Sequence, residues 1–146
     1  MLLDPRAPRF AAAITTAVLA VALVTGSTLL LIVQALIFAV TAANPRIGPY
    51  GVLYRSLIAP RVAPPTELEP AAPVRFAQLV GLVFVLVATI GNLAGVPALG
   101  LAATGAALAA AFLNAAFDLC LGCVGYLALR RMAGRPMAAR VPVGLS

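Results

Sequence analysis

Two thiols and one carboxyl are the side chains of this sequence best suited to chemistry. Cys120 and Cys123 form a CxxC pair, and Asp118 lies two residues before the first thiol. Cysteines three residues apart on a helix have Cα atoms within disulfide range, so the pair could cycle between dithiol and disulfide or carry a persulfide. The chain has no His, which excludes Ser-His-Asp and Cys-His catalysis. Cys120, Cys123 and Asp118 are therefore the candidate catalytic residues.

Other interpretations of these residues stay open. A buried Cys is often only a small apolar residue, and the pair could also bind a metal jointly with a partner or a second subunit. Two cysteines without His are too few ligands for a closed zinc site, so we expect no metal or cofactor held by this chain alone. Asp118 and Asn114 share one helix face, where they could form a packing hydrogen bond or line a path for an ion or proton.

The composition places the chain in a membrane. Its 146 residues are 63% hydrophobic and 10% charged, whereas soluble domains carry about 25% charged residues. The net charge of +6 comes from ten Arg and no Lys against four acids. The chain has no basic motif with interleaved aromatic residues, so we expect the Arg side chains to meet lipid headgroups and not nucleic acid. The lipid bilayer is thus the first partner that the sequence predicts.

Long apolar segments between the Arg residues predict an all-α membrane protein with a single domain, 1–146. We expect four transmembrane helices arranged as two hairpins, at about 10–26, 28–43, 76–93 and 99–129. Small or turn-forming residues around Gly26 and Gly95 separate the two members of each hairpin. With four spans, every Arg, both termini and the loop 44–75 lie on one side, which the positive-inside rule makes cytoplasmic. The sequence therefore predicts a multi-pass protein of the bacterial inner (plasma) membrane.

The predicted fourth span determines the depth of the thiols. Counted back from Arg130 along a continuous helix, Cys123 lies about 10 Å and Cys120 about 15 Å inside the cytoplasmic boundary. Asp118 would be an acid within a span, where a carboxyl is expected to be neutral, hydrated or paired. On such a helix Asp118 and Cys123 are about 140° apart. We therefore expect no contact between this acid and the thiols unless the helix loosens near Gly122.

The middle loop predicts a short amphipathic helix at 49–59. Aromatic and aliphatic residues recur there at the spacing of one helical face. We expect this helix to lie flat on the cytoplasmic membrane surface as an interfacial helix, and the alternative is a docking surface for a soluble partner. The proline-rich segment 61–74 that follows is expected to be extended and partly exposed.

The two predicted hairpins open on similar sequences. Asp4-Pro5 followed by Arg9-Phe10-Ala11 recurs as Glu69-Pro70 followed by Arg75-Phe76-Ala77. In each copy the acid and the proline lie in water, the Arg meets phosphate and the Phe enters the apolar edge. The echo raises the hypothesis of a tandem repeat with two parallel halves.

Several of these segments together resemble a known family. The similar segments are Arg9-Phe10-Ala11, Gly48-Pro49-Tyr50, the stretch from Glu69-Pro70 to Arg75-Phe76-Ala77, and Cys120-Leu121-Gly122-Cys123. They resemble small bacterial membrane proteins of domain of unknown function 4395 (DUF4395), over about residues 4–129. The family brings no established activity with it, but it is similar in setting to proteins encoded beside thioredoxin-like proteins or sulfurtransferases. The resemblance therefore implies a partner of one of these two kinds.

The leading functional hypothesis is a membrane component of thiol or sulfur redox handling. In this hypothesis Cys120 and Cys123 react with a thioredoxin-like or sulfurtransferase partner, and whether the component is itself an enzyme stays open. The first alternative is a non-catalytic subunit of a larger membrane complex or a homo-oligomer, which the Ala-rich and Gly-rich fourth span favours. The second alternative is a small-solute or ion transporter, based on Asp118, Asn114 and Gln34.

Overall fold

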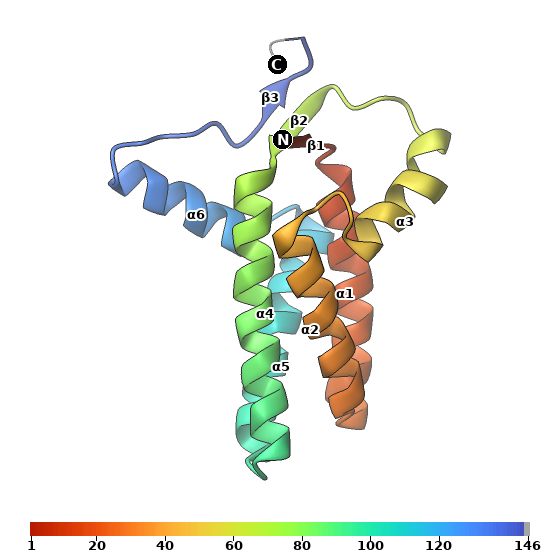
Figure 1. Ribbon diagram of the computed structural model, residues 1–146, viewed down its shortest axis with the longest axis vertical. Coiled ribbons are helices and arrows are strands. Elements are labelled where there is room, and N and C mark those ends of the chain that lie inside the picture. The colour runs from red at the N-terminus through yellow and green to blue at the C-terminus, as the bar shows by residue number, and fades with distance from the viewer. Residues whose placement is uncertain (145–146) are drawn as a thin grey trace.

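The computed structural model describes residues 1–144, and these residues form one bundle of helices (Figure 1). Within this range the chain is all-helical, as predicted, apart from three short strands and one 3₁₀ turn at Ala59–Arg61. The order of elements is β1 (Leu2–Leu3), α1 (Arg6–Thr25), α2 (Thr28–Ala43), α3 (Pro49–Leu57), β2 (Glu67–Pro70), α4 (Ala71–Leu93), α5 (Pro97–Phe117), α6 (Leu121–Met132) and β3 (Val141–Pro142).

Helices α1, α2, α4 and α5 run side by side, while α3 and α6 lie across one end of the bundle on opposite sides (Figure 1). Turns form at both places where small residues predict them. α1 ends at Gly26 in a left-handed conformation, and the hydroxyl of Ser27 caps α2 by accepting the N–H of Leu30 at 3.3 Å. Gly95 has φ 75°, and Pro97 is the first residue of α5, a position where its missing N–H costs nothing.

Three helices, α1, α4 and α5, are long and apolar enough to cross a membrane, with 20, 23 and 21 residues. α2 is also apolar but has 16 residues, or about 24 Å, which is short of a hydrocarbon core of about 30 Å. The outer faces of the helices carry large exposed apolar side chains, among them Val24, Leu36 and Ile90. These helices are compatible with a multi-pass membrane protein, since such a surface is unfavourable in water.

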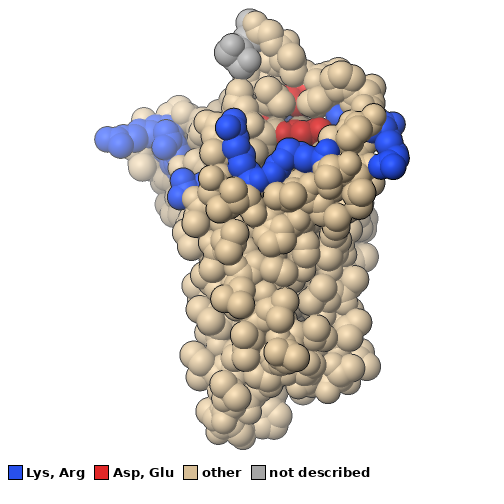
Figure 2. Space-filling view, turned by 45° about the vertical axis from the view of Figure 1, so that its right-hand side comes forward, with Lys and Arg blue, Asp and Glu red and all other residues tan. Residues whose placement is uncertain are grey.

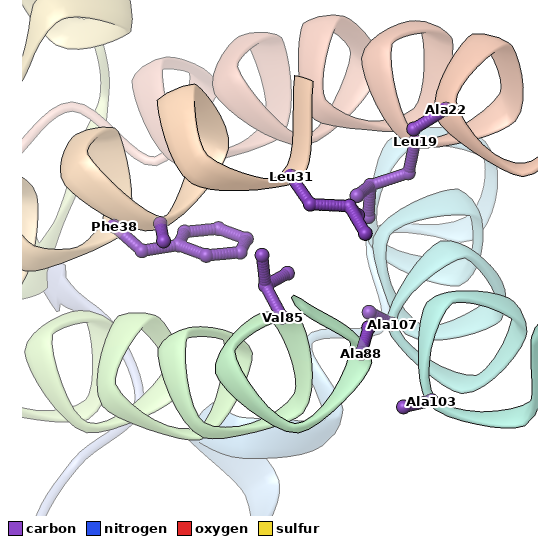
Figure 3. Packing of buried hydrophobic residues seen from close by; sticks show 9 residues of the cluster. Leu19, Ala22, Leu31, Phe38, Val85, Ala88, Ala103 and Ala107 are labelled. Carbon is purple, nitrogen blue, oxygen red and sulfur yellow. The ribbon is translucent and has the colours of Figure 1, made fainter. Parts of the chain in front are cut away.

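Buried aliphatic side chains and small residues fill the centre of the bundle. Leu19, Leu31, Phe38 and Val85 meet there with several alanines (Figure 3). The wholly buried Gln34 joins three elements, because its amide donates to Thr15 at 3.4 Å and accepts from the Tyr50 hydroxyl at 2.8 Å. Gln34 therefore links α1 and α2. It also attaches α3 to the bundle.

The predicted middle helix is confirmed as α3, and its aromatic face packs on α1. The Tyr54 ring lies 5.7 Å from the Phe10 ring, and its hydroxyl donates to the Asp4 carboxylate at 3.0 Å. Burial alone would raise the pKa of Asp4, but hydrogen bonds from Arg6 and Tyr54 outweigh it, so the pKa lies below its ordinary value. The hydroxyls of Tyr50 and Tyr54 therefore both bind polar groups of this chain.

Charged side chains gather at the end of the bundle that holds α3, α6, the N-terminus and β3 (Figures 1 and 2). The three strands lie there in the order β1-β2-β3, all antiparallel. Leu3 pairs with Glu69, and Leu68 pairs with Val141. The segment expected to be extended at 61–74 is therefore divided, since it forms β2 up to Pro70 and then enters α4. Pairing on both edges of β2 fixes the position of Glu69 at the start of α4.

Candidate functional site

The predicted fourth span at 99–129 is not one helix. α5 ends at Phe117, and α6 begins at Leu121. Asp118 between them adopts a left-handed conformation with φ 55°, which Asp tolerates better than most residues and which commonly ends a helix. The guanidinium of Arg9 donates to two carbonyls in the last turn of α5, at 3.0 and 3.4 Å. These carbonyls thus have partners although the helix stops.

The break brings the CxxC pair to the start of a helix. Cys120 is the N-cap of α6, and its Sγ accepts the N–H of Cys123 at 3.3 Å. The two cysteines form a disulfide with their Cα atoms 5.2 Å apart. The depths of about 10 and 15 Å assumed a continuous helix and do not apply to this arrangement. After reduction, a thiolate on Cys120 would face the partial positive charge of the helix N-terminus, which stabilises it.

The two sulfur-bearing residues differ in accessibility. Cys123 is buried at 6% exposure, whereas Cys120 is half-buried. Gly122 lies between them against α4, where a Cβ would come within 2.6 Å of the Cα of Ala77. The first turn of α6 therefore packs directly on α4 and covers Cys123. Cys120 is therefore the more accessible of the two residues.

A cavity of about 430 Å³ lies beside the disulfide. Its walls come from the start of α1, from β2, from the end of α5, from the start of α6 and from the segment before β3. We call it the thiol cavity, and its polar or sulfur-bearing lining residues are Glu67, Glu69, Asn114, Asp118, Cys120, Cys123 and Arg140. All three predicted site residues line it together.

This grouping corrects the predicted separation of Asp118 from the thiols. On a continuous helix the acid would face away from Cys123, but the break at Asp118 turns both toward one cavity. Asp118 also lies at the C-terminal end of α5 and not within a helix. Its carboxylate accepts a hydrogen bond from Arg140, so among the expected states of this acid the structure has the paired one.

Glu69 is a member of the site that the sequence analysis did not single out. Burial raises the pKa of its carboxyl to about 7, an effect that Asp118 reinforces and Arg140 partly opposes. A carboxyl with this pKa can release or accept a proton near neutral pH. Glu69 reaches the cavity because β2 pairs with β1 and β3. These strands are too short to be recognised from local sequence, so the sequence did not reveal this position.

Arg140 brings the C-terminal tail into the site. Besides its bond to Asp118, its guanidinium lies 4.0 Å from Glu67. The sequence did not single out Arg140, because the acids around it come together only in the folded structure. Three of the four acids in the chain face one cavity, which requires a cation.

Metal binding by this group has no geometric support. Within residues 1–144, no cluster of three or more His, Cys, Asp or Glu side chains is arranged to hold a metal ion. The chemistry that the arrangement does offer is thiol–disulfide exchange, with a carboxyl nearby to move the proton.

The fold and the site together define a membrane-compatible helical protein with a disulfide at a helix N-terminus. The chain belongs to the family described as Domain of unknown function (DUF4395), whose profile matches residues 3–131. This match confirms the resemblance drawn from the short segments. No curated protein and no solved structure matches the chain. Arg140 lies outside the matched range, so the cation of the thiol cavity comes from beyond the family domain.

The raised pKa of Glu69 predicts that removing its charge increases folding stability, and that this increase depends on pH. An unfolded chain ionises this carboxyl from about pH 4.5 and the folded chain from about pH 7, so folding stability falls as the pH rises between these values. We expect Glu69→Gln to stabilise the protein at pH 8 by roughly 1 kcal/mol, after discounting for solvent screening. The gain should disappear below pH 4.5, as measured by thermal unfolding in detergent. The exposed neighbour Glu67→Gln is the control, and equal gains in both variants would contradict the assignment.

Proposed function

We propose that the protein is a membrane-embedded thiol–disulfide exchange component that reacts with a water-soluble, thioredoxin-like dithiol protein. The observation that carries this proposal is the Cys120–Cys123 disulfide at the N-terminus of α6, open to the thiol cavity at the charged end. Redox-active pairs use a helix N-terminus because it stabilises the attacking or leaving thiolate. The setting that the family resemblance implies, beside thioredoxin-like proteins, agrees with such a partner.

Exchange starts from the disulfide and takes two electrons from the partner. A thiolate of the partner attacks the accessible Sγ of Cys120, the bond between Cys120 and Cys123 breaks, and Cys123 leaves as a thiolate. Glu69 in its protonated form donates a proton to that leaving sulfur. The partner's second thiolate then attacks the mixed disulfide, Cys120 leaves as a thiolate that takes a proton from water in the thiol cavity, and the partner is left oxidised. The reverse sequence requires Glu69 to take the proton back.

The order of attack predicts different behaviour of the two single-cysteine variants. Cys123→Ser leaves Cys120 free without a resolving thiol, so its mixed disulfide with a thioredoxin that also lacks its resolving cysteine should persist. Cys120→Ser leaves only the covered thiol, and we expect roughly tenfold less adduct from it, in line with lower access. Each variant is incubated with a single-cysteine thioredoxin whose remaining sulfur is activated as a disulfide with thionitrobenzoate, which leaves when the variant's thiolate attacks. The adduct is resolved on a non-reducing gel with mass spectrometry of the linked peptides. Equal adduct from both variants contradicts the assigned order of attack.

The role of Glu69 as proton donor predicts a pH profile for the rate of disulfide reduction that a purely structural role would not produce. We measure reduction of the disulfide by thioredoxin from pH 5 to 9 and divide each rate by the thiolate fraction of the reductant. The wild-type rate should fall above about pH 7 as Glu69 loses its proton. Glu69→Gln should give a flat profile, slower by roughly tenfold or more at pH 6, because general acids contribute at least this much. Glu67→Gln should keep the wild-type profile, and an inflection that survives in Glu69→Gln argues against the role.

For the membrane, we propose that α1, α2, α4 and α5 all cross the bacterial inner membrane, with both termini in the cytoplasm. The clustering of Arg at one end supports this orientation (Figure 2). The turn at Gly26 supplies extra length to the short α2. A cytoplasmic thiol cavity is also where a soluble dithiol partner would be available in reduced form.

Impermeant labelling distinguishes this orientation from the inverse one. In a variant with both native cysteines replaced by Ser, a single Cys is introduced either at Ala94, in the turn before α5, or at Ser56, in α3. Both positions are exposed. A membrane-impermeant maleimide added to spheroplasts should label Ala94→Cys, and it should label Ser56→Cys only after lysis. The opposite pattern overturns the proposed orientation.

A further inference from the structure

A second cavity of about 440 Å³ adjoins the thiol cavity. Pro8, Asn114 and Cys120 line both cavities, so the accessible cysteine separates the two spaces. The remaining walls of this second space come mainly from α1, α4, α5 and α6, and they are largely apolar. We call it the lateral cavity. It has the size of a small-molecule site, since such sites enclose about 300 to 1,000 Å³.

Small side chains on α5 and α6 leave this space open. The α5 wall consists of Ala106, Ala107, Ala110 and Ala111, and on α6 a Cβ built on Gly125 would meet nothing within 4 Å. Three aromatic rings complete the walls, from Phe38, Phe76 and Phe84. Two of its lining residues, Phe84 and Ala106, are exposed, so the cavity is open, and its apolar lining suits entry from lipid. Flat apolar groups pack well against such rings.

The electrons collected by the cysteine pair need an acceptor. Exchange with a soluble dithiol leaves Cys120 and Cys123 reduced, and the pair must be reoxidised before it can react again. The Cys120 sulfur can be approached from water through the thiol cavity and from lipid through the lateral cavity. An acyl chain would fill the second space but accept no electrons. A helix of another copy, about 10 Å wide, is too large for it.

We propose that the lateral cavity binds a membrane-soluble quinone, which reoxidises the Cys120–Cys123 pair. This inference rests on the proposed function, because it names the acceptor for the same thiols. Two S–H bonds break and one S–S bond forms, while the quinone takes up two electrons and two protons and becomes a hydroquinone with two O–H groups. The ring lies between the aromatic walls and the Ala-lined side of α5, with its isoprenoid tail toward lipid. Asn114, at the boundary of the two cavities, offers an amide donor to a quinone carbonyl.

The test uses the purified full chain in lipid nanodiscs, reduced and freed of reductant under anaerobic conditions. The probe is a fully substituted benzoquinone with a decyl chain, to which thiols cannot add at a free ring position. Quinone absorbance and thiol alkylation are followed together, and we expect one quinone consumed for each cysteine pair oxidised. Ala106→Leu should slow the reaction about tenfold or more, since extra methylenes in a fitted pocket have effects of this size. Ala109→Leu is the matched control, because Ala109 is an exposed alanine of α5 outside the cavity lining.

Each outcome separates this inference from the proposed function. Both Leu variants should still exchange with thioredoxin at the wild-type rate, which verifies their fold. A reduced wild type that exchanges with thioredoxin but leaves the quinone unchanged overturns the quinone inference alone. Equal rates in wild type, Ala106→Leu and Ala109→Leu show that the cavity holds only lipid, which also overturns it. A wild type that does not exchange with thioredoxin overturns the proposed function instead.

Discussion

The end of α5 is the constraint on which the rest of the site depends. Arg9 donates to the last carbonyls of α5, and Asp118 takes the left-handed conformation that stops the helix. Without this break, Cys120 would lie inside a continuous helix, where the preceding turn already occupies the N–H groups that could stabilise a thiolate. With it, α6 starts afresh, and its free amides face the sulfur. One cation on α1 therefore places the disulfide where exchange chemistry is favourable.

Corresponding residues in the two halves of the chain make the same kinds of interaction, except for the acid that opens each half. Arg75 donates to the last turn of α2 at 2.7 Å, as Arg9 does to α5. Phe76 packs on Tyr126 of α6, as Phe10 packs on Tyr54 of α3. These parallels support the tandem-repeat hypothesis. The acids differ because Asp4 has Arg6 two residues later, whereas the position two residues after Glu69 is an alanine. The first acid is neutralised by its own segment, and the second keeps a carboxyl that titrates near neutrality.

Sequence reasoning located the elements that depend on local pattern and missed those that depend on distant contacts. Residue type and spacing were enough to predict the turns at Gly26 and Gly95, the helix α3 and the pair of cysteines. They were not enough to predict the break at Asp118, because the apolar run continues through Leu119 and Leu121, and Arg9, which donates to the last carbonyls of α5, lies more than a hundred positions earlier. The acids and the cation of the thiol cavity likewise meet only through strands of two to four residues.

Cys120 lies between two unlike cavities. This position gives a physical reason for placing charged side chains so close to an apolar space. A disulfide at the surface of a soluble domain meets only water-soluble reactants, and one buried in a span meets only lipid-soluble ones. Here the sulfur lies at the boundary, with carboxyls and a guanidinium on one side and Phe and Ala side chains on the other. Charge stays on the polar side, where Arg140 balances the acids, so the apolar side carries no unpaired ion. In the proposed reaction, electrons cross between the two phases through the Cys120 sulfur, while Glu69 exchanges the proton on the polar side.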